Sequence, residues 1–107
     1  MTGAAGMLGH DLVALLAPGH EVTAVDLDVD VTDPAAVRTC VRDARPEAVF
    51  HLAAWTDVDG AEAREAEAHA VNADGAGNVA AAAAEVGAAV VYPSTDYVFD
   101  GRKGAPY

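Results

Sequence analysis

The 107-residue sequence predicts an α/β fold in which helices cover both faces of a parallel sheet. Short β-branched or apolar runs alternate with longer segments whose apolar residues recur at helical spacing, which is typical of consecutive strand–helix–strand units. The run over residues 48–54 is nearly continuously apolar, as expected for a strand that is covered on both faces. A turn with a glycine at every third position precedes the first helical segment.

Caps and breakers set the boundaries of the predicted elements. A leucine stripe at helical spacing over residues 8–16 predicts the first helix, which a Pro-Gly pair ends. Asp33 and Pro34 suit the N-cap and the first position of a second helix. Gly75 and Gly77 predict close packing or a break within a long Ala- and Glu-rich helix. The remaining predicted elements are strands over 21–28, 48–54 and 88–92 and helices over 34–45 and 61–86.

Composition limits the classes of partner. The chain has 17 acidic against 6 basic residues and a formal net charge of −11, so nucleic acids and anionic membrane surfaces would repel it. Its single cysteine, Cys40, cannot form an internal disulfide, and the sequence has neither a membrane-spanning apolar run nor a secretory signal pattern. We therefore expect a cytoplasmic protein with no membrane or nucleic-acid partner. The four histidines have no metal-ligand spacing, so no metal site is expected.

The glycine-rich turn is the first candidate binding element. It reads Thr-Gly-Ala-Ala-Gly-Met-Leu-Gly over residues 2–9, with Gly3, Gly6 and Gly9 three positions apart. Glycine admits backbone angles that are closed to other residues, and without a Cβ it lets a ligand approach the main chain. The free N–H groups and the positive dipole end of the following helix favour a pyrophosphate. By itself, the turn is equally compatible with a simple helix cap.

Asp26 is a candidate for ribose binding. It lies at the end of the predicted strand that follows the first helix, 23 positions after Gly3. In dinucleotide-binding folds, an acid about 20 residues beyond the turn accepts hydrogen bonds from the adenosine ribose, and its charge repels a 2′-phosphate. Asp28 and Asp30 are competitors for this role. All three acids also fit an ordinary solvated strand end.

The order of elements fits an incomplete Rossmann domain. A Rossmann unit places its glycine-rich turn after a central strand, whereas only Met1 and Thr2 precede Gly3 here. We therefore expect a Rossmann-like three-layer parallel sheet that lacks its first strand and its C-terminal part. Loss of that strand would leave backbone groups of the neighbouring strands unpaired, so we expect the isolated chain to have low stability.

Five segments carry a resemblance to one enzyme family. They are residues 2–9, Asp-Val-Thr-Asp at 30–33, Leu-Ala-Ala-Trp-Thr-Asp-Val-Asp at 52–59, Val-Asn-Ala-Asp-Gly at 71–75 and Ser-Thr-Asp-Tyr-Val-Phe-Asp-Gly at 94–101. Together and in this order they resemble the dTDP-4-dehydrorhamnose reductase family, which belongs to the extended short-chain dehydrogenase/reductase superfamily. The first segment is shared across the superfamily, whereas the last is much more specific. The resemblance covers essentially the whole chain.

The resemblance implies reduction of dTDP-4-dehydro-L-rhamnose to dTDP-L-rhamnose with NADPH or NADH. It assigns residues 1–107 to a partial NAD(P)-binding Rossmann domain with the substrate domain absent, and it implies a homodimer for a full-length protein. Thr95 matches the catalytic hydroxyl residue, which donates a hydrogen bond to the substrate keto oxygen, and Asp96 would lie beside the sugar nucleotide. The implied cofactor residues are Gly6, Met7, Leu8 and Gly9 at the pyrophosphate, Asp30 and Val31 at the adenine, and Ala53, Ala54 and Trp55 toward the nicotinamide.

One departure from the family limits the implied activity. The catalytic tyrosine and lysine of the family form a Tyr-x-x-x-Lys motif, and none of Tyr92, Tyr97 and Tyr107 has a lysine four residues later. The chain alone is therefore expected to be inactive. The resemblance also extends to a non-catalytic regulatory subunit of methionine adenosyltransferase and, less well, to nucleotide-sugar epimerases and dehydratases, which stay open as alternatives.

Overall fold

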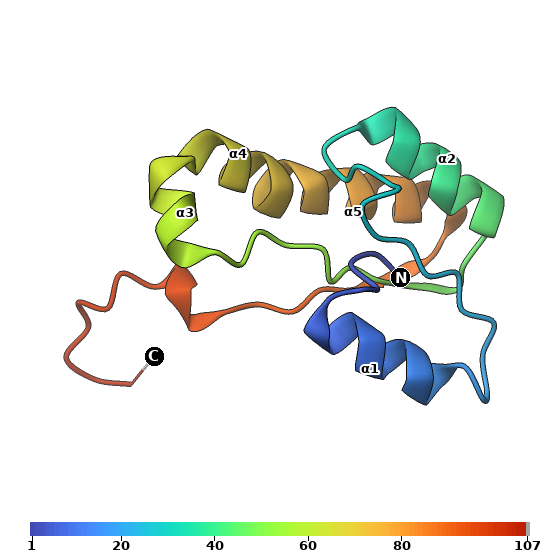
Figure 1. The fold of residues 1–107 in the computed structure, drawn as a ribbon, viewed down its shortest axis with the longest axis horizontal. Helices are drawn as coiled ribbons and strands as arrows, with labels where there is room; N and C mark the ends of the chain where they lie inside the picture. Colours follow the sequence, from blue (N-terminus) through green and yellow to red (C-terminus); the bar gives the residue numbers. More distant parts are fainter. Residues whose placement is uncertain (107) are drawn as a thin grey trace.

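A layer of strands lies between helix α1 (Met7–Leu16) and the other helices (Figure 1). The computed structural model describes residues 1–106. Strands β1 (Ala48–Phe50) and β2 (Ala89–Val91) are parallel, and Val49 pairs with Val90. The predicted α/β fold, with helices on both faces of a parallel sheet, is confirmed. The other elements are α2 (Pro34–Ala44), α3 (Val58–Ala63), α4 (Glu65–His69), the π-helix η1 (Ala70–Asp74), α5 (Gly75–Val86) and the 3₁₀-helix η2 (Asp96–Val98).

The N-terminal residues extend the sheet beside β1. Thr2 pairs in parallel with the residue that follows β1, and its N–H donates to the Phe50 carbonyl at 3.0 Å. On the other side, the Met1 carbonyl accepts a hydrogen bond from the Val25 N–H at 2.9 Å. After the N-terminal residues, the chain therefore first places residues 23–25 on one side of them and later places β1 on the other side. Open α/β sheets bind their ligands at such a switch point, outside the carboxyl ends of the strands.

The prediction of a strand over residues 21–28 is wrong. Residues 21–25 are extended without forming a strand, and residues 26–29 turn. The N-terminal residues lie alongside this segment with three hydrogen bonds, in which Thr23 accepts from the Met1 amino group and Val25 pairs with Met1 and Ala4. A strand needs a repeated ladder of such pairs, and these few contacts end at the glycine-rich turn. The other two predicted strands are each shortened to three residues.

The predicted helix over residues 61–86 is present but divided. It begins three residues earlier, where Asp57 caps α3. Arg64, with a φ of −132°, separates α3 from α4, and η1 separates α4 from α5. Gly75 follows η1 directly and lies so close to Val31 that a Cβ would come within 2.9 Å of its side chain. Close packing and an interruption therefore coincide at this glycine, as its position in the sequence predicted.

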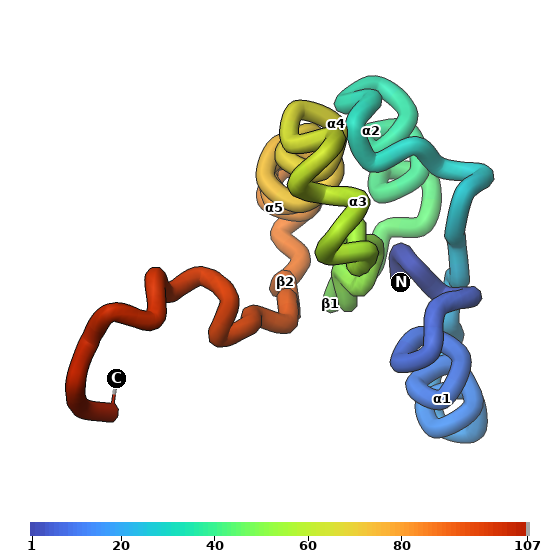
Figure 2. The backbone as a smooth tube through the Cα atoms, turned by 60° about the vertical axis from the view of Figure 1, so that its left-hand side comes forward, coloured from blue at the N-terminus to red at the C-terminus, as the bar shows by residue number. Residues whose placement is uncertain are grey.

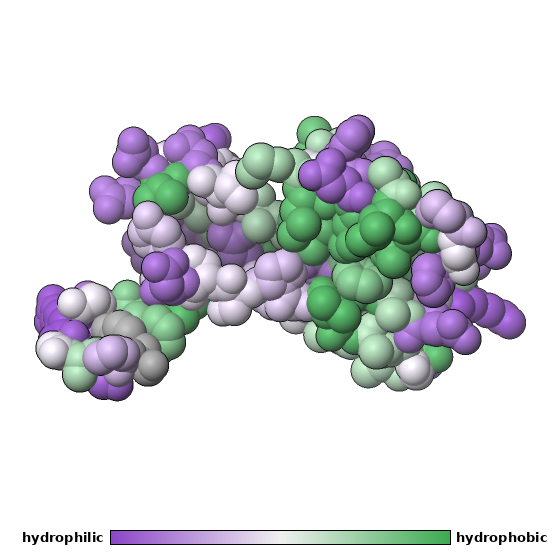
Figure 3. Space-filling model, turned by 90° about the horizontal axis from the view of Figure 1, so that it is seen from below, coloured by the Kyte–Doolittle hydropathy of each residue, from purple (hydrophilic) through white to green (hydrophobic). Residues whose placement is uncertain are grey.

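Helix α1 carries the predicted leucine stripe, but the described chain covers little of it. Gly9 is buried, whereas Leu8 and Leu15 are 55% and 74% exposed. Figure 3 looks at the molecule from this side and shows hydrophobic side chains gathered on the surface. The three residues of β2 are exposed as well. The expected low stability of the chain stays a prediction, and this uncovered apolar surface is a structural reason for it.

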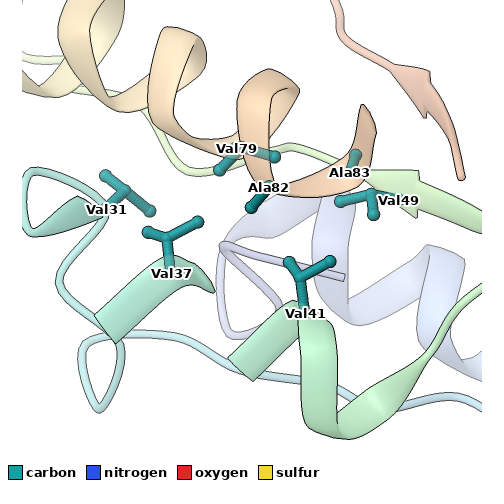
Figure 4. Packing of buried hydrophobic residues seen from close by; sticks show 7 residues of the cluster. All are labelled: Val31, Val37, Val41, Val49, Val79, Ala82 and Ala83. Atoms are coloured by element: carbon teal, nitrogen blue, oxygen red, sulfur yellow. The ribbon is translucent and has the colours of Figure 1, made fainter. Parts of the chain in front are cut away.

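A small aliphatic core joins α2, β1 and α5 (Figure 4). Helix α2 begins as predicted, because the Asp33 carboxylate accepts the Ala35 N–H at 2.8 Å. Val79 of α5 is fully buried between the layers. The core consists of Val31, Val37, Val41, Val49, Val79, Ala82 and Ala83.

Truncation of the core should destabilise the whole fold. We expect Val79→Ala to lower the free energy of unfolding by about 2 kcal/mol, because it removes two buried methyl groups and leaves a cavity. Urea unfolding followed by circular dichroism measures this change. The matched variant Val90→Ala, at a position that is 38% exposed in β2, should cost much less. Equal losses in the two variants would show that the core is not where the structure places it.

Candidate functional site

A groove of about 1830 Å³ crosses the carboxyl ends of the strands. Its walls come from the glycine-rich turn, the segment after residue 25, the loop after β1, helix α4 with η1, and the segment after β2. All eleven residues that the sequence assigns to cofactor binding line this groove, and Thr95 lines it too. The structure therefore brings together residues from four separate motifs. Asp96 is the one assigned residue that does not line the groove.

The three glycines of the turn have different structural roles. Gly3 has a φ of +67°, and a Cβ on it would lie 2.5 Å from the Ala53 N atom, so the turn can lie against the end of β1 only with glycine there. A Cβ on Gly9 would overlap the backbone of Gly3, so this glycine lets α1 pack onto the turn. A Cβ on Gly6 would meet only the Gly3 carbonyl, at 3.2 Å. Gly6 thus leaves its side of the backbone open for a ligand.

The N-terminus of α1 provides hydrogen-bond donors to the groove. Gly6 is the N-cap residue and contributes no side-chain cap, so no described side chain occupies the first N–H groups of this ten-residue helix. Met7 and Leu8, which carry those groups, line the groove. Its described lining includes four carboxylate residues but no lysine or arginine. An anionic ligand here would therefore be held by backbone N–H groups and the helix dipole.

Asp26 holds the glycine-rich turn from the opposite side. Its Oδ2 accepts the Ala5 N–H at 2.8 Å, and its Oδ1 accepts the Leu27 N–H at 3.1 Å. Asp28 is separated from this role because it turns back to accept the Asp26 N–H at 2.7 Å and does not line the groove. Of the two remaining acids, Asp26 is the one that contacts the turn itself.

Asp30 lies farther along the same wall of the groove. Its Oδ1 accepts hydrogen bonds from the Thr32 hydroxyl at 2.7 Å and from the Thr32 N–H at 2.9 Å. These bonds lower the pKa of the Asp30 carboxyl below its ordinary value and keep it ionised. Val31, the next residue, packs into the core and against Gly75. Residues 30–31 are thereby fixed at one end of the groove.

Asn72 fixes the loop after β1, and the sequence analysis assigned it no role. Its Oδ1 accepts the Trp55 N–H at 2.8 Å, and its Nδ2 donates to the Trp55 carbonyl at 3.2 Å. Arg64 stacks over the Trp55 ring at 4.3 Å from its centroid. Asn72 lies in η1, and π-helical turns are often found at functional sites. An amide inside an otherwise Ala-rich helical segment was the available signal, and Asn72 shares this feature with Asn78.

The segment after β2 leads away from the strands (Figure 2), and Thr95 belongs to this segment. Its hydroxyl donates to the Asp96 carboxylate and accepts the Tyr97 N–H, both at 3.3 Å, which caps η2. These are long bonds for a hydroxyl, so a shorter one can replace them. Thr95 thus presents a donor to the groove beyond the loop that holds Trp55.

His51 is the most buried polar residue beneath the groove. It is 1% exposed, its Nδ1 lies 2.7 Å from the Thr2 hydroxyl, and its ring stacks on Tyr92 with the centroids 5.1 Å apart. Its Nε2 is buried and has no hydrogen-bond partner among residues 1–106. Burial also lowers the pKa of His51 below its ordinary value. Of the two ring nitrogens, Nδ1 thus has a hydrogen-bond partner within the chain.

Among residues 1–106, no group of three or more His, Cys, Asp or Glu side chains is placed to hold a metal ion. No helix in the same part of the chain is long and apolar enough to cross a membrane.

Tyr92 donates its hydroxyl to the Asn72 carbonyl at 3.1 Å, and Tyr97 lines the groove. Tyr107, which the sequence analysis excluded as a catalytic tyrosine, lies outside the described residues.

Known proteins resemble this chain along its whole length. A model of the RmlD substrate binding domain matches residues 1–107. The chain belongs to the RmlD substrate binding domain family. The dTDP-4-dehydrorhamnose reductase of Streptomyces griseus is 50% identical over 100% of this chain and 36% of its own length. The dTDP-4-keto-6-deoxy-D-glucose reductase of Streptomyces niveus is 47% identical over 100% of this chain and 38% of its own length.

A solved reductase has the same fold. The dTDP-4-dehydrorhamnose reductase of Bacillus anthracis, in a crystal structure with NADP, is 43% identical and superposes with a TM-score of 0.90 over 96% of this chain and 38% of that chain. The family resemblance and the Rossmann-like fold read from the sequence are therefore confirmed. The chain spans somewhat more than a third of the length of these relatives.

Acidification should destabilise the chain through His51. Because burial lowers the pKa of His51 from 6.5 in the folded state, the unfolded chain takes up a proton that the folded chain resists. This contribution to stability is present above pH 6.5 and is lost as the pH falls through the lowered pKa. Urea midpoints measured from about pH 7 to about pH 5 should therefore fall, and His51→Asn should reduce the slope.

The control for this pH dependence is His10→Asn, at an exposed position on α1. It should keep the wild-type slope. If His51→Asn and the wild-type chain lose stability in parallel over this pH range, then protonation of His51 is not the cause.

Proposed function

We propose that residues 1–107 form the dinucleotide-binding part of an NAD(P)H-dependent reductase that converts dTDP-4-dehydro-L-rhamnose to dTDP-L-rhamnose. The observation that carries the proposal is the groove at the switch point of the sheet, which is lined by all eleven assigned cofactor residues and by Thr95. The two similar curated relatives described above are both named reductases of dTDP-linked keto sugars, which supports this function over a regulatory subunit or an epimerase. The free Cys40 is consistent with a reducing cytoplasm.

The residues of the groove fit an NAD(P)H molecule. Its pyrophosphate would lie against the uncapped N-terminus of α1, where Gly6 leaves space that a Cβ would restrict. Asp26 would accept the hydroxyls of the adenosine ribose with the lone pairs that its two protein hydrogen bonds leave free. Asp30 and Val31 would border the adenine, and residues 53–55 would lie along the nicotinamide end. When bound, the reduced nicotinamide supplies hydride.

Thr95 would polarise the substrate. A hydroxyl that donates to the 4-keto oxygen stabilises the negative charge that develops on this oxygen during reduction, as a donor in an oxyanion hole does. To do so, the Thr95 hydroxyl exchanges its 3.3 Å bond to Asp96 for a shorter bond to the substrate. Asp96 does not line the groove, so it is assigned no further role in this step. No tyrosine of the sequence is followed by lysine at the fourth position, so none is assigned as proton donor.

The chain should bind NADH more tightly than NADPH. The charge of Asp26 repels a 2′-phosphate, and the described lining has no lysine or arginine to compensate, so we expect about a tenfold difference in Kd. Asp26→Asn should reduce this ratio toward one, because an amide oxygen still accepts the Ala5 N–H while the charge is removed. Trp55 is the only tryptophan and lines the groove, so quenching of its fluorescence reports binding.

Asp28→Asn is the control for this experiment, because Asp28 does not line the groove. It should leave the ratio of the two Kd values near that of the wild-type chain. A ratio that is unaffected by Asp26→Asn would refute the assignment of Asp26 to the ribose.

Thr95 should be needed for turnover but not for cofactor binding. Residues 1–107 can replace the matching segment of the Streptomyces griseus reductase, and the chimera is assayed for oxidation of NADH and NADPH with dTDP-4-dehydro-L-rhamnose. Thr95→Val should lower kcat by about 100-fold to 1000-fold with little change in the KM for the dinucleotide. Thr95→Ser keeps the donor and should retain most of the activity.

If the chimera with Thr95→Val reduces the keto sugar as fast as the chimera without this substitution, the role assigned to Thr95 is contradicted. The second substrate is dTDP-4-keto-6-deoxy-D-glucose, named by the Streptomyces niveus relative. Faster turnover of this sugar would correct the proposed substrate while leaving the reductase function in place.

A further inference from the structure

We propose that His51 is a positioning residue that fixes the distance between the two ends of the groove, namely the glycine-rich turn and the segment that carries Thr95. The inference rests on the proposed function, because it concerns how one dinucleotide can reach both ends. It assigns a task to a buried side chain that lines the groove and that the proposed mechanism leaves unused.

His51, the residue after β1, connects the N-terminal residues with β2 through its backbone. Thr2 bridges to it in parallel on one side. On the other side, its N–H donates to the Val91 carbonyl at 2.9 Å. Phe50, the residue before His51, pairs with Val91, the residue before Tyr92. His51 therefore lies between the N-terminal residues and the end of β2.

The side chains repeat this connection. The Thr2 hydroxyl lies 2.7 Å from the His51 Nδ1 with both groups buried, and the Tyr92 ring stacks on the imidazole at an interplanar angle of 25°. Thr2 is followed directly by Gly3, whose backbone begins the turn. Tyr92 precedes Thr95 by three residues and also donates to the Asn72 carbonyl at 3.1 Å. One imidazole thus contacts the residues from which both ends of the groove start.

The burial of His51 makes this connection specific. The His51 side chain is 1% exposed and Thr2 is 8% exposed, so water cannot readily replace the contact between them. A phenylalanine would fill the same space and keep the stack on Tyr92, yet nature places there a residue whose Nε2 has no partner among the described residues. The hydrogen bond to Thr2 is what a phenylalanine would lose. The polar contact at Nδ1 is therefore the feature to test.

Ligands of different length separate positioning from simple support of the fold. ADP occupies only the part of the groove near the turn, whereas NADH must also reach residues 53–55. If His51 sets the distance between the two ends, Thr2→Val in the 107-residue chain should raise the Kd for NADH about fivefold, the usual effect of one lost hydrogen bond. The Kd for ADP should stay within about twofold of the wild-type value. Quenching of Trp55 fluorescence measures NADH, and competition with NADH measures ADP.

Two further variants complete the test. Tyr92→Leu removes the ring that stacks on His51. It should likewise weaken the binding of NADH more than the binding of ADP, so the result does not depend on Thr2 alone. His51→Phe should match Thr2→Val, and the double variant should be no worse than either, because both remove the same contact. Val79→Ala lowers stability at a core position that does not itself line the groove and should change neither Kd.

Each outcome decides a different claim. Equal weakening of ADP and NADH, or a loss of stability with both Kd values unchanged, would overturn the positioning role and leave His51 as a support of the fold. Additive effects of Thr2→Val and His51→Phe would overturn it as well. If the wild-type chain binds neither NADH nor NADPH, the proposed function itself fails. Binding of NADH by the wild-type chain together with any of the first three results refutes only the inference about His51.

Discussion

The contact between the glycine-rich turn and the end of β1 is the constraint on which the rest of the site depends. Gly3 lies against the backbone at Leu52 and Ala53 with no space for a Cβ, and Thr2 pairs with the same segment one residue earlier. This contact places the start of α1 above the carboxyl ends of the strands. It also brings the helix N-terminus and the loop of Trp55 to opposite sides of one groove.

Because the molecule carries a large negative charge, the binding of an anionic ligand depends on local dipoles. A protein with a net charge of −11 repels an anionic ligand at long range, but salt limits such repulsion to about 10 Å. Within that distance, the N–H groups at the start of α1 provide hydrogen-bond donors for phosphates. Asp26 and Asp30 then favour hydroxyl groups over a further phosphate. The arrangement selects by where the ligand carries charge rather than by how much charge it carries.

Prediction from sequence was accurate where the deciding partner is close along the chain. Asp33 caps the next turn of its own helix, and Gly9 packs against Gly3 and Ala4 of its own turn. Prediction from sequence failed where a contact with a residue far away in the sequence determines the structure. The strand over residues 21–28 depends on how much chain lies beside it, and local β-branched residues do not reveal that. Asn72 is set by its contact with Trp55, 17 residues away, in a helix whose division no local propensity specifies.

The hydrogen bond from Ala5 to Asp26 has a consequence for the kinetics of binding. Because Gly3 rests on β1 and Ala5 is held by Asp26, the turn is restrained on both sides before any ligand arrives. A preorganised receptor loses little conformational entropy on association, so more of the contact energy remains as affinity. Encounter is then limited by diffusion and orientation of the ligand rather than by folding of the loop around it. The rate of release carries most of the difference between one nucleotide and another.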